Sequence, residues 1–262
     1  MPNSSESNSA SSNGLVFHLQ DVSYSYEDGA VGLEGVNLAV QPGERLAILG
    51  SNGSGKSTLL KILDGLYFPE QGHVSAFGQP LSEEALRDDT VHYAFRRRVG
   101  LVFQDSDVQL FSPSVWDEVA FAPLQLGLRR EEVIERTRQA LAALGITGLS
   151  ERAPHRLSGG EKKRVALASV LSQAPEVWLL DEPTAGLDPR TAAWLIEFIN
   201  DQARQGHSLV IATHDLELVR SAADRVLLLG EDHRPAAEGP AEDILADSAL
   251  LERHNLIRAS QD

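Results

Sequence analysis

The stretch Gly50-Ser51-Asn52-Gly53-Ser54-Gly55-Lys56-Ser57-Thr58 decides the fold class, because it places a lysine and two hydroxyl side chains after a glycine-rich turn. An apolar run, Leu46-Ala47-Ile48-Leu49, precedes it, and Leu59-Leu60-Lys61-Ile62-Leu63 follows. A buried strand, a glycine-rich turn and a helix form the context in which the pattern G-x-x-x-x-G-K-[ST] binds phosphate. The turn can direct backbone N–H groups at an anion, and the helix adds its positive N-terminal end. We therefore predict a nucleoside triphosphate site in which Lys56 reaches the β- and γ-phosphates and Ser57 ligates Mg²⁺.

The composition is that of an ordinary globular protein. Of the 262 residues, 42% are hydrophobic and 23% are charged, which suits one large domain, with or without a subdomain. The chain has no cysteine, so disulfides and thiolate metal sites are excluded. The formal net charge of −15 argues against binding to nucleic acid or to an anionic bilayer. We expect no nucleic-acid partner, and any association with a membrane should go through a protein partner.

The N-terminal segment differs from the rest of the chain. Residues 1–13, MPNSSESNSASSN, are polar and contain no apolar stretch of the kind found in a signal peptide. This composition predicts a disordered tail. No apolar run in the sequence approaches the length of a transmembrane helix, so we expect a soluble protein.

Strand and helix patterns alternate after the glycine-rich turn, which predicts an α/β fold whose mostly parallel core sheet is covered by helices. The apolar strand candidates span residues 99–104, 176–182, 208–213 and 225–229, and the helix candidates 117–128, 131–144, 158–173, 190–205 and 216–222. Two further strand candidates, residues 16–26 and 35–40, come before the turn. Residues 79–95 form a charged, weakly patterned insertion that we place at the surface.

Two adjacent carboxylates end one of the apolar strands, Leu179-Leu180-Asp181-Glu182. An acidic side chain at the end of a buried strand holds Mg²⁺ in enzymes with a phosphate-binding loop, and Asp181 fits that role. Glu182 can polarise the attacking water as a general base. The alternative is that both carboxylates only keep the strand end soluble.

A second anion-binding helix start lies between these two halves of the site. Leu157-Ser158-Gly159-Gly160-Glu161-Lys162-Lys163-Arg164 opens a helix with a serine and two glycines. One chain with two such helix starts but one phosphate-binding loop suggests a site shared between two chains. The segment resembles the signature motif of the ATP-binding cassette (ABC) ATPases, and the order of motifs is similar to that family over residues 15–230.

The resemblance implies a role for each matching residue. It implies ATP and Mg²⁺ as ligands, with Ser158 and Gly160 capping the γ-phosphate held by a second cassette, which is either another copy or a paralogue. Tyr26 matches the aromatic residue that stacks on adenine, although a half-buried strand tyrosine is the alternative. Gln104 matches the Q-loop glutamine near Mg²⁺ and water, Asp188 the D-loop at the dimer interface, and His214 the histidine that contacts the γ-phosphate.

The resemblance also implies the domain organisation. We expect an ABC ATPase domain over residues 14–240, with an N-terminal antiparallel β subdomain and a helical subdomain at about 105–170. A C-terminal helical extension is expected over residues 241–262.

Two stretches are similar to the energy-coupling factor (ECF) group of this family, especially to cobalt and nickel uptake ATPases. They are Val102-Phe103-Gln104-Asp105-Ser106-Asp107-Val108-Gln109-Leu110-Phe111 and Val115-Trp116-Asp117-Glu118-Val119-Ala120-Phe121-Ala122-Pro123. In the second stretch Glu118 and Ala122 replace the usual Asp and Gly. This difference leaves open which metal is transported, but it does not change the resemblance to the ECF group.

The ECF resemblance implies an ATPase that drives import of cobalt, nickel or a vitamin. It would act at the cytoplasmic face of the membrane, as a peripheral subunit with a scaffold subunit and a substrate-binding membrane subunit. The alternatives are the ATPase of another ABC transporter, either an amino-acid importer or an exporter, and a soluble ABC ATPase without a membrane partner.

Overall fold

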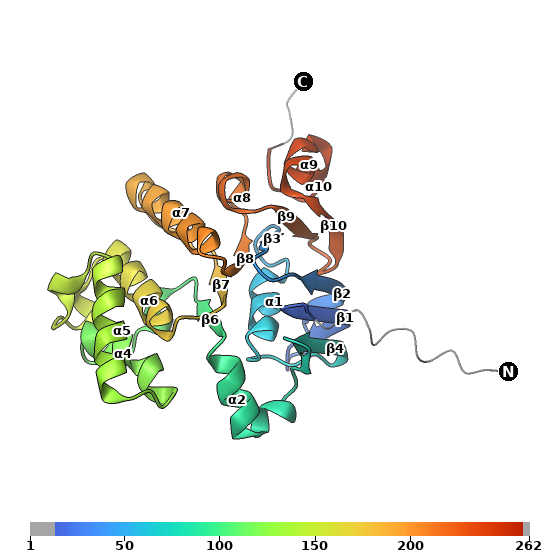
Figure 1. Cartoon of the computed structure of the whole chain (residues 1–262). Helices are drawn as coiled ribbons and strands as arrows, with labels where there is room; N and C mark the ends of the chain where they lie inside the picture. Colours follow the sequence, from blue (N-terminus) through green and yellow to red (C-terminus); the bar gives the residue numbers. More distant parts are fainter. Residues whose placement is uncertain (1–13, 259–262) are drawn as a thin grey trace.

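The computed structural model describes residues 14–258, in which the strands form two sheets with helices around them (Figure 1). The predicted tail at residues 1–13 lies outside the described residues, as do residues 259–262 of the predicted C-terminal extension. No helix among the described residues is long and apolar enough to cross a bilayer.

The smaller sheet is antiparallel and carries the N-terminal strands. Its spatial order is β2 (Val31–Val40), β1 (Phe17–Ser25), β4 (Gln71–Ala76) and β5 (Gln79–Pro80). Alternate residues of β1, among them Phe17 and Leu19, are fully buried, so one face of this sheet packs on the core. The predicted N-terminal antiparallel sheet is thereby confirmed, although β2 begins four residues earlier than the sequence indicated.

The larger sheet is mostly parallel, as predicted. Its spatial order is β10 (Pro235–Pro240), β9 (Arg225–Leu229), β3 (Arg45–Leu49), β8 (Ser208–Thr213), β7 (Val177–Asp181) and β6 (Val99–Val102). Only β10 runs antiparallel to its neighbour in this sheet. The parallel pairing aligns the carboxyl ends of β3, β7 and β8, with Leu49 beside Thr213 and Asp181 beside Ala212. Three of the sequence motifs follow these strand ends, so the register brings them to one edge of the sheet.

Helices cover both faces of the larger sheet. They are α1 (Lys56–Leu63), α2 (Asp89–Arg96), α3 (Ser106–Gln109), α4 (Val115–Gln125), α5 (Arg130–Ala143), α6 (Gly159–Gln173), α7 (Pro189–Arg204), α8 (Leu216–Ala222), α9 (Ala241–Ala246) and α10 (Ser248–Arg253). Figure 1 shows α4, α5 and α6 gathered on the side away from the smaller sheet. Short 3₁₀ turns span Ala85–Arg87, Thr147–Leu149 and Pro154–Arg156.

The alternation within β7 explains how the sheet is buried on both faces. Val177 and Leu179 belong to a core shared with α1 and the smaller sheet, so α1 lies between the two sheets. Trp178 and Leu180 point to the opposite face and pack with α6 and α7. Burial on both faces is why this strand reads as a continuous apolar run in the sequence.

The charged insertion is more structured than the sequence indicated. Its residues are mostly exposed, but the side chain of Phe95 is buried. The side chain of Asp88 accepts hydrogen bonds from the backbone N–H groups of Thr90 and Val91 and so caps α2. Arg96 at the end of α2 donates to the carboxylate of Asp64 at 2.8 Å. Asp64 is the residue directly after α1, so an ion pair attaches the insertion to the helix that follows the glycine-rich turn.

Burial raises the pKa of Asp64 to about 6, although Arg96 acts in the opposite direction. Because the folded-state pKa lies above that of the unfolded chain, this carboxyl favours the folded state at low pH, and that contribution is lost as the pH rises through about 6. Relative to Asp64→Asn, we expect the parent's free energy of unfolding to fall by roughly 3 kcal/mol between pH 3.5 and pH 7. Urea titrations of both proteins across this range measure the difference, and parallel pH profiles would contradict it.

Candidate active site

The glycine-rich turn after β3 is shaped by close backbone approaches. Gly55 has φ of +102°, a conformation that favours glycine, and a Cβ at this position would overlap the carbonyl oxygen of Gly32. A Cβ at Gly50 would come within 2.8 Å of the carbonyl oxygen of Leu229. The turn therefore passes too close to its neighbours for side chains at these positions, and α1 starts directly behind it at Lys56.

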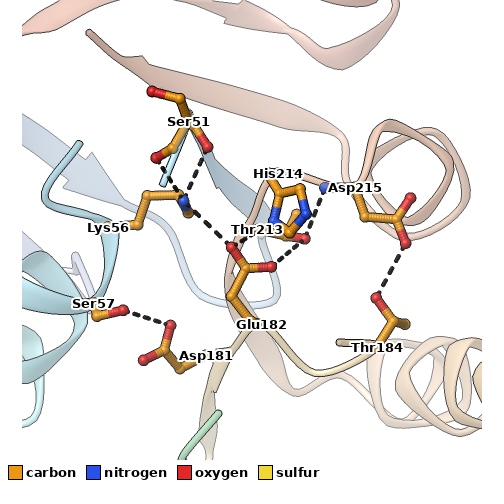
Figure 2. Close-up of polar contacts among 10 residues, drawn as sticks. Ser51, Lys56, Ser57, Asp181, Glu182, Thr184, Thr213, His214 and Asp215 are labelled. Carbon is orange, nitrogen blue, oxygen red and sulfur yellow. Dashed lines mark hydrogen bonds and ion pairs between the residues drawn. The ribbon is translucent and has the colours of Figure 1, made fainter. Parts of the chain in front are cut away.

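Lys56 is the cation of the site, and its side chain is 5% exposed. Its Nζ donates to the carbonyl oxygens of Gly50 at 2.9 Å and Ser51 at 3.0 Å. It also lies 3.3 Å from Oε1 of Glu182. Figure 2 shows the ammonium group held between the turn and this carboxylate.

Glu182 is held by one short segment of the chain, Ala212 to His214, in addition to Lys56. Its Oε1 lies 2.9 Å from Nδ1 of His214, and its Oε2 accepts a hydrogen bond from the hydroxyl of Thr213 at 3.1 Å. Its backbone N–H donates to the carbonyl oxygen of Ala212 at 2.8 Å. Glu182 has φ of +40°, which is uncommon for a residue with a side chain, so the neighbouring strand holds it in a strained conformation. This carboxylate is buried and fixed in direction, as a general base requires.

Asp181 lies beside Ser57, whose hydroxyl donates to its Oδ1 at 2.9 Å (Figure 2). Burial raises the pKa of Asp181, while the Ser57 hydrogen bond and the charges of Lys61 and Lys56 oppose that shift. A hydroxyl and a carboxylate are hard oxygen ligands of the kind that Mg²⁺ prefers. Among the described residues no group of three or more His, Cys, Asp or Glu side chains could hold a metal. An ion here would therefore need further oxygen ligands from water or phosphate, which is the usual way Mg²⁺ is bound in such enzymes.

A cavity of about 330 Å³ opens over the turn. Its lining residues are Tyr26, Val31, Gly32, Asn52, Gly53, Gly55, Lys56, Ser57, Thr58, Gln104, Glu182 and His233. The volume lies in the range of small-molecule sites. With Lys56 and the first turn of α1 at one part of its wall, the cavity has the donor set that a triphosphate needs.

Tyr26 lies in this cavity wall, where its hydroxyl shares a hydrogen bond with that of Thr58 at 2.5 Å. Its ring contacts Tyr24 edge to face, with a centroid distance of 5.3 Å. The side chain is 37% exposed, so an aromatic surface remains accessible. This placement fits both the predicted stacking on adenine and the alternative of a half-buried strand tyrosine. The stacking therefore stays a prediction.

Three predicted residues lie together but do not line the cavity. Ser158 caps α6 by accepting from the backbone N–H of Glu161, whose carboxylate accepts in return from the Ser158 backbone. A Cβ at Gly160 would lie 3.5 Å from Thr191, the residue whose hydroxyl donates to Asp188 at 2.6 Å. The structure thus gathers Ser158, Gly160 and Asp188 at the starts of α6 and α7, whereas the other predicted residues cluster at the strand ends.

Gln104 lines the cavity, and its main chain is held by a residue that the sequence analysis did not assign. Lys163 of α6 donates to the carbonyl oxygens of Phe103 and Gln104, both at 3.1 Å. The side chain of Lys163 is buried, and burial lowers its pKa. Its position one residue before the end of the segment Leu157–Arg164 was the only signal in the sequence, and it carried no information about Gln104.

Thr213 and His233 were also missed. Thr213 directly precedes His214, so the run Ala212-Thr213-His214-Asp215 could have drawn attention to its hydroxyl. Nothing in the sequence marks His233, which the fold alone brings to the cavity.

The parallel sheet, the glycine-rich turn after β3 and the acidic residues at the end of β7 define a P-loop nucleoside triphosphatase. Comparison with known proteins narrows this class. The model of the ABC transporter family matches residues 33–185.

Individual relatives cover nearly the whole chain. The nickel import ATP-binding protein NikO of Rhodobacter capsulatus is 52% identical over 244 residues, covering 92% of this chain and 95% of that protein. An energy-coupling factor transporter ATP-binding protein, EcfA of Methanothermobacter thermautotrophicus, is 44% identical over 241 residues, covering 92% of this chain and 76% of that protein. The solved structure of CbiO1 from Clostridium perfringens, described as part of the ABC transporter complex CbiONQ, superposes with a TM-score of 0.77 at 36% identity, covering 93% of this chain and 95% of that one.

The chain belongs to the ABC transporter family and is an ATPase that hydrolyses ATP for transport. Within that family it is an ATP-binding subunit close to the energy-coupling factor ATPases. The predicted family and fold class are thereby confirmed.

We expect Glu182→Gln to lower the ATP turnover number at least about 100-fold, because an amide cannot accept the proton of the attacking water. ATP affinity should stay within about threefold of the parent's, since the amide keeps the shape of the side chain. The control is Glu176→Gln, the same change just before the start of β7, where the exposed carboxylate pairs with Arg98. Steady-state hydrolysis and calorimetric titration with ATP measure both quantities, and full turnover in Glu182→Gln would rule out the assignment.

Proposed function

We propose that this protein couples ATP binding and hydrolysis to the import of a transition metal ion, cobalt or nickel, or of a vitamin, through membrane partner subunits. The observation that carries the hydrolytic part is the meeting of Lys56, Glu182 and His214 at the strand ends. The name of the relative NikO supports nickel, and the resemblance of residues 102–123 to ECF ATPases supports the wider group of substrates.

Within the site, each residue has a proposed task. Lys56 and the N–H groups of the turn bind the β- and γ-phosphates, and Ser57, Asp181 and Gln104 contact Mg²⁺. Glu182 polarises the attacking water, and His214 contacts the γ-phosphate. The remaining nucleotide-binding residues are Tyr26, Gly50, Ser51, Asn52, Gly53, Ser54, Gly55, Thr58, Ser158, Gly160 and Asp188. Tyr26 stacks on the adenine.

The separation of two phosphate-binding helix starts supports a dimer of cassettes. Ser158 and Gly160 present an exposed helix N-terminus that does not line the cavity of their own chain. A second cassette, a copy or a paralogue, brings this N-terminus over the γ-phosphate. ATP then joins the two cassettes, and hydrolysis releases them.

Gly159→Asp tests this arrangement, because a Cβ at Gly159 meets no atom within 4 Å and an acid in the first turn of α6 suits the helix dipole. We expect the variant to fold and to bind ATP as the parent does. It should not dimerise with ATP, since the new carboxylate would face the partner's γ-phosphate. The control is Gly148→Asp, another exposed position with no atom within 4 Å of an added Cβ.

Both variants are made in a Glu182→Gln background, where bound ATP persists, and their mass is followed by light scattering. If Gly159→Asp dimerised as readily as Gly148→Asp, the shared site would be wrong.

An exposed apolar cluster supports a membrane partner. It consists of Phe111 and Phe121, with Val108 three residues before the first and Leu124 three residues after the second, and these side chains are between 39% and 70% exposed. Phe111 and Phe121 meet edge to face with centroids 4.9 Å apart. Glu118 holds this surface in place, because its buried carboxylate accepts from the backbone N–H groups at positions 111 and 112 at 2.9 and 2.7 Å.

The apolar cluster lies just after Gln104 in the chain, and Lys163 holds the backbone of that residue against α6. Nucleotide-dependent movement of α6 can therefore reach the cluster. A soluble ABC ATPase without a membrane partner has no need for such a surface, whereas another type of ABC transporter would use it equally well. We place the protein at the cytoplasmic face of the membrane as a peripheral subunit.

Phe111→Ser is expected to lose the membrane partners while keeping ATP affinity, because the ring is 66% exposed and is not among the buried residues of the core. The measurement is co-purification from detergent-solubilised membranes, followed by uptake of Co²⁺, Ni²⁺ and vitamins by cells expressing the complete gene set. The control is Tyr93→Ser, an exposed aromatic residue on α2. Purification of the parent without any membrane protein would favour the soluble alternative.

A further inference from the structure

His233 is a cavity residue that neither the motifs nor the proposed catalytic roles include. It lies in the turn between β9 and β10, far along the chain from the other residues of the wall. Its half-buried side chain lines the same cavity as Tyr26 and Lys56. A titratable aromatic ring in a nucleotide cavity needs an account of what it contacts.

The backbone shows that the turn itself does not require a histidine. His233 has φ of +64°, the left-handed conformation that glycine and asparagine adopt most easily. Two hydrogen bonds close the turn. The N–H of His233 donates to the carbonyl oxygen of Gly230 at 3.1 Å, and the N–H of Gly230 donates to the carbonyl oxygen of Arg234 at 2.9 Å. All of them use main-chain atoms, so glycine would close it with less strain. A histidine at this position therefore costs backbone strain that glycine would avoid, and the geometry of the turn does not explain why a histidine is present.

The ring also has an unmet hydrogen bond. Nδ1 of His233 is buried and has no partner in the described part of the chain. Buried polar atoms are nearly always paired, so an unpaired one calls for a missing partner. A half turn of the ring about the Cβ–Cγ bond exchanges Nδ1 with a carbon atom and leaves the backbone unchanged. The half turn thus moves this nitrogen to the other edge of the ring without disturbing the fold.

Contacts with β2 indicate which end of the cavity His233 occupies. Its carbonyl oxygen accepts from the backbone N–H of Glu34 at 3.0 Å, and the neighbouring Arg234 pairs with the Glu34 carboxylate. Glu34 follows Val31 and Gly32, which line the cavity beside Tyr26. His233 is thus attached to the strand whose residues Val31 and Gly32 line the cavity beside Tyr26, whereas Lys56 and Glu182 follow the carboxyl ends of β3 and β7.

We propose that His233 is a nucleotide-binding residue that contacts the nucleoside part of ATP, with Nδ1 hydrogen-bonded to a base or ribose donor. This inference rests on the proposed assignment of the cavity to ATP. In the tautomer protonated at Nε2, Nδ1 accepts a hydrogen bond, and the exocyclic amine of adenine and the ribose hydroxyls are the donors a nucleoside offers. His233 takes no part in phosphate binding.

The test replaces His233 with glycine, which keeps the turn and removes the ring. ATP and inorganic tripolyphosphate are titrated into the full-length protein by calorimetry, and thermal unfolding checks the fold. We expect His233→Gly to weaken ATP binding about fivefold, the size of one hydrogen bond, and to leave tripolyphosphate binding unchanged. The control is Asp21→Gly, which also introduces glycine at a position of positive φ. Asp21 is exposed, has φ of +50° and does not line the cavity.

Unchanged ATP affinity in His233→Gly would overturn the proposal, and so would an equal loss for ATP and tripolyphosphate. Lys56→Ala, measured alongside, should weaken both ligands. If Lys56→Ala bound both as the parent does, the assignment of the cavity to ATP would fail. If Lys56→Ala lost both while His233→Gly lost neither, only the role of His233 would fail.

Discussion

The buried carboxylate of Glu182 and its partners are the interaction on which the rest of the site depends. Its side chain is 6% exposed, and a charge so removed from water is costly unless it is paired and hydrogen-bonded. Lys56 from the turn and Thr213 and His214 from the end of β8 provide those partners. None of them is near Glu182 in the chain, so the cost is offset only when the parallel sheet is formed.

This dependence makes the site preorganised. Lys56 donates to two carbonyl oxygens of the turn, so the ammonium that pairs with Glu182 also fixes the backbone around it. Glu182 keeps an uncommon positive φ because its N–H is bonded to Ala212 of the adjacent strand. A carboxylate whose direction is set before the substrate arrives loses little orientational freedom during a reaction.

The predictions from sequence succeeded where the pattern was local. The glycine-rich turn lies between a buried strand and a helix, as predicted, and a hydrogen bond joins Ser57 to Asp181, whose shared role in Mg²⁺ binding stays a prediction. The predictions were incomplete where a contact joins distant segments. They did not include the ion pair between Asp64 and Arg96 or the hydrogen bond from Lys163 to the backbone of Gln104. They also did not place His233 in the cavity. The insertion at residues 79–95 was missed as a helix because its charges obscure the apolar period that Phe95 completes.

The sequence by itself determined the glycine-rich turn between a strand and a helix and most of the order of strands and helices, because periodicity and motif spacing are properties of neighbouring residues. The resemblance of its motifs indicated the family. The tertiary structure decided which side chains meet. Parallel register brings Asp181, Glu182 and His214 to the turn of Lys56, and the packing of β10 beside β9 carries His233 to the wall of Tyr26. The start of α6 lies away from the cavity of its own chain for the same reason. Distances between segments depend on how the whole core packs, and no local pattern encodes them.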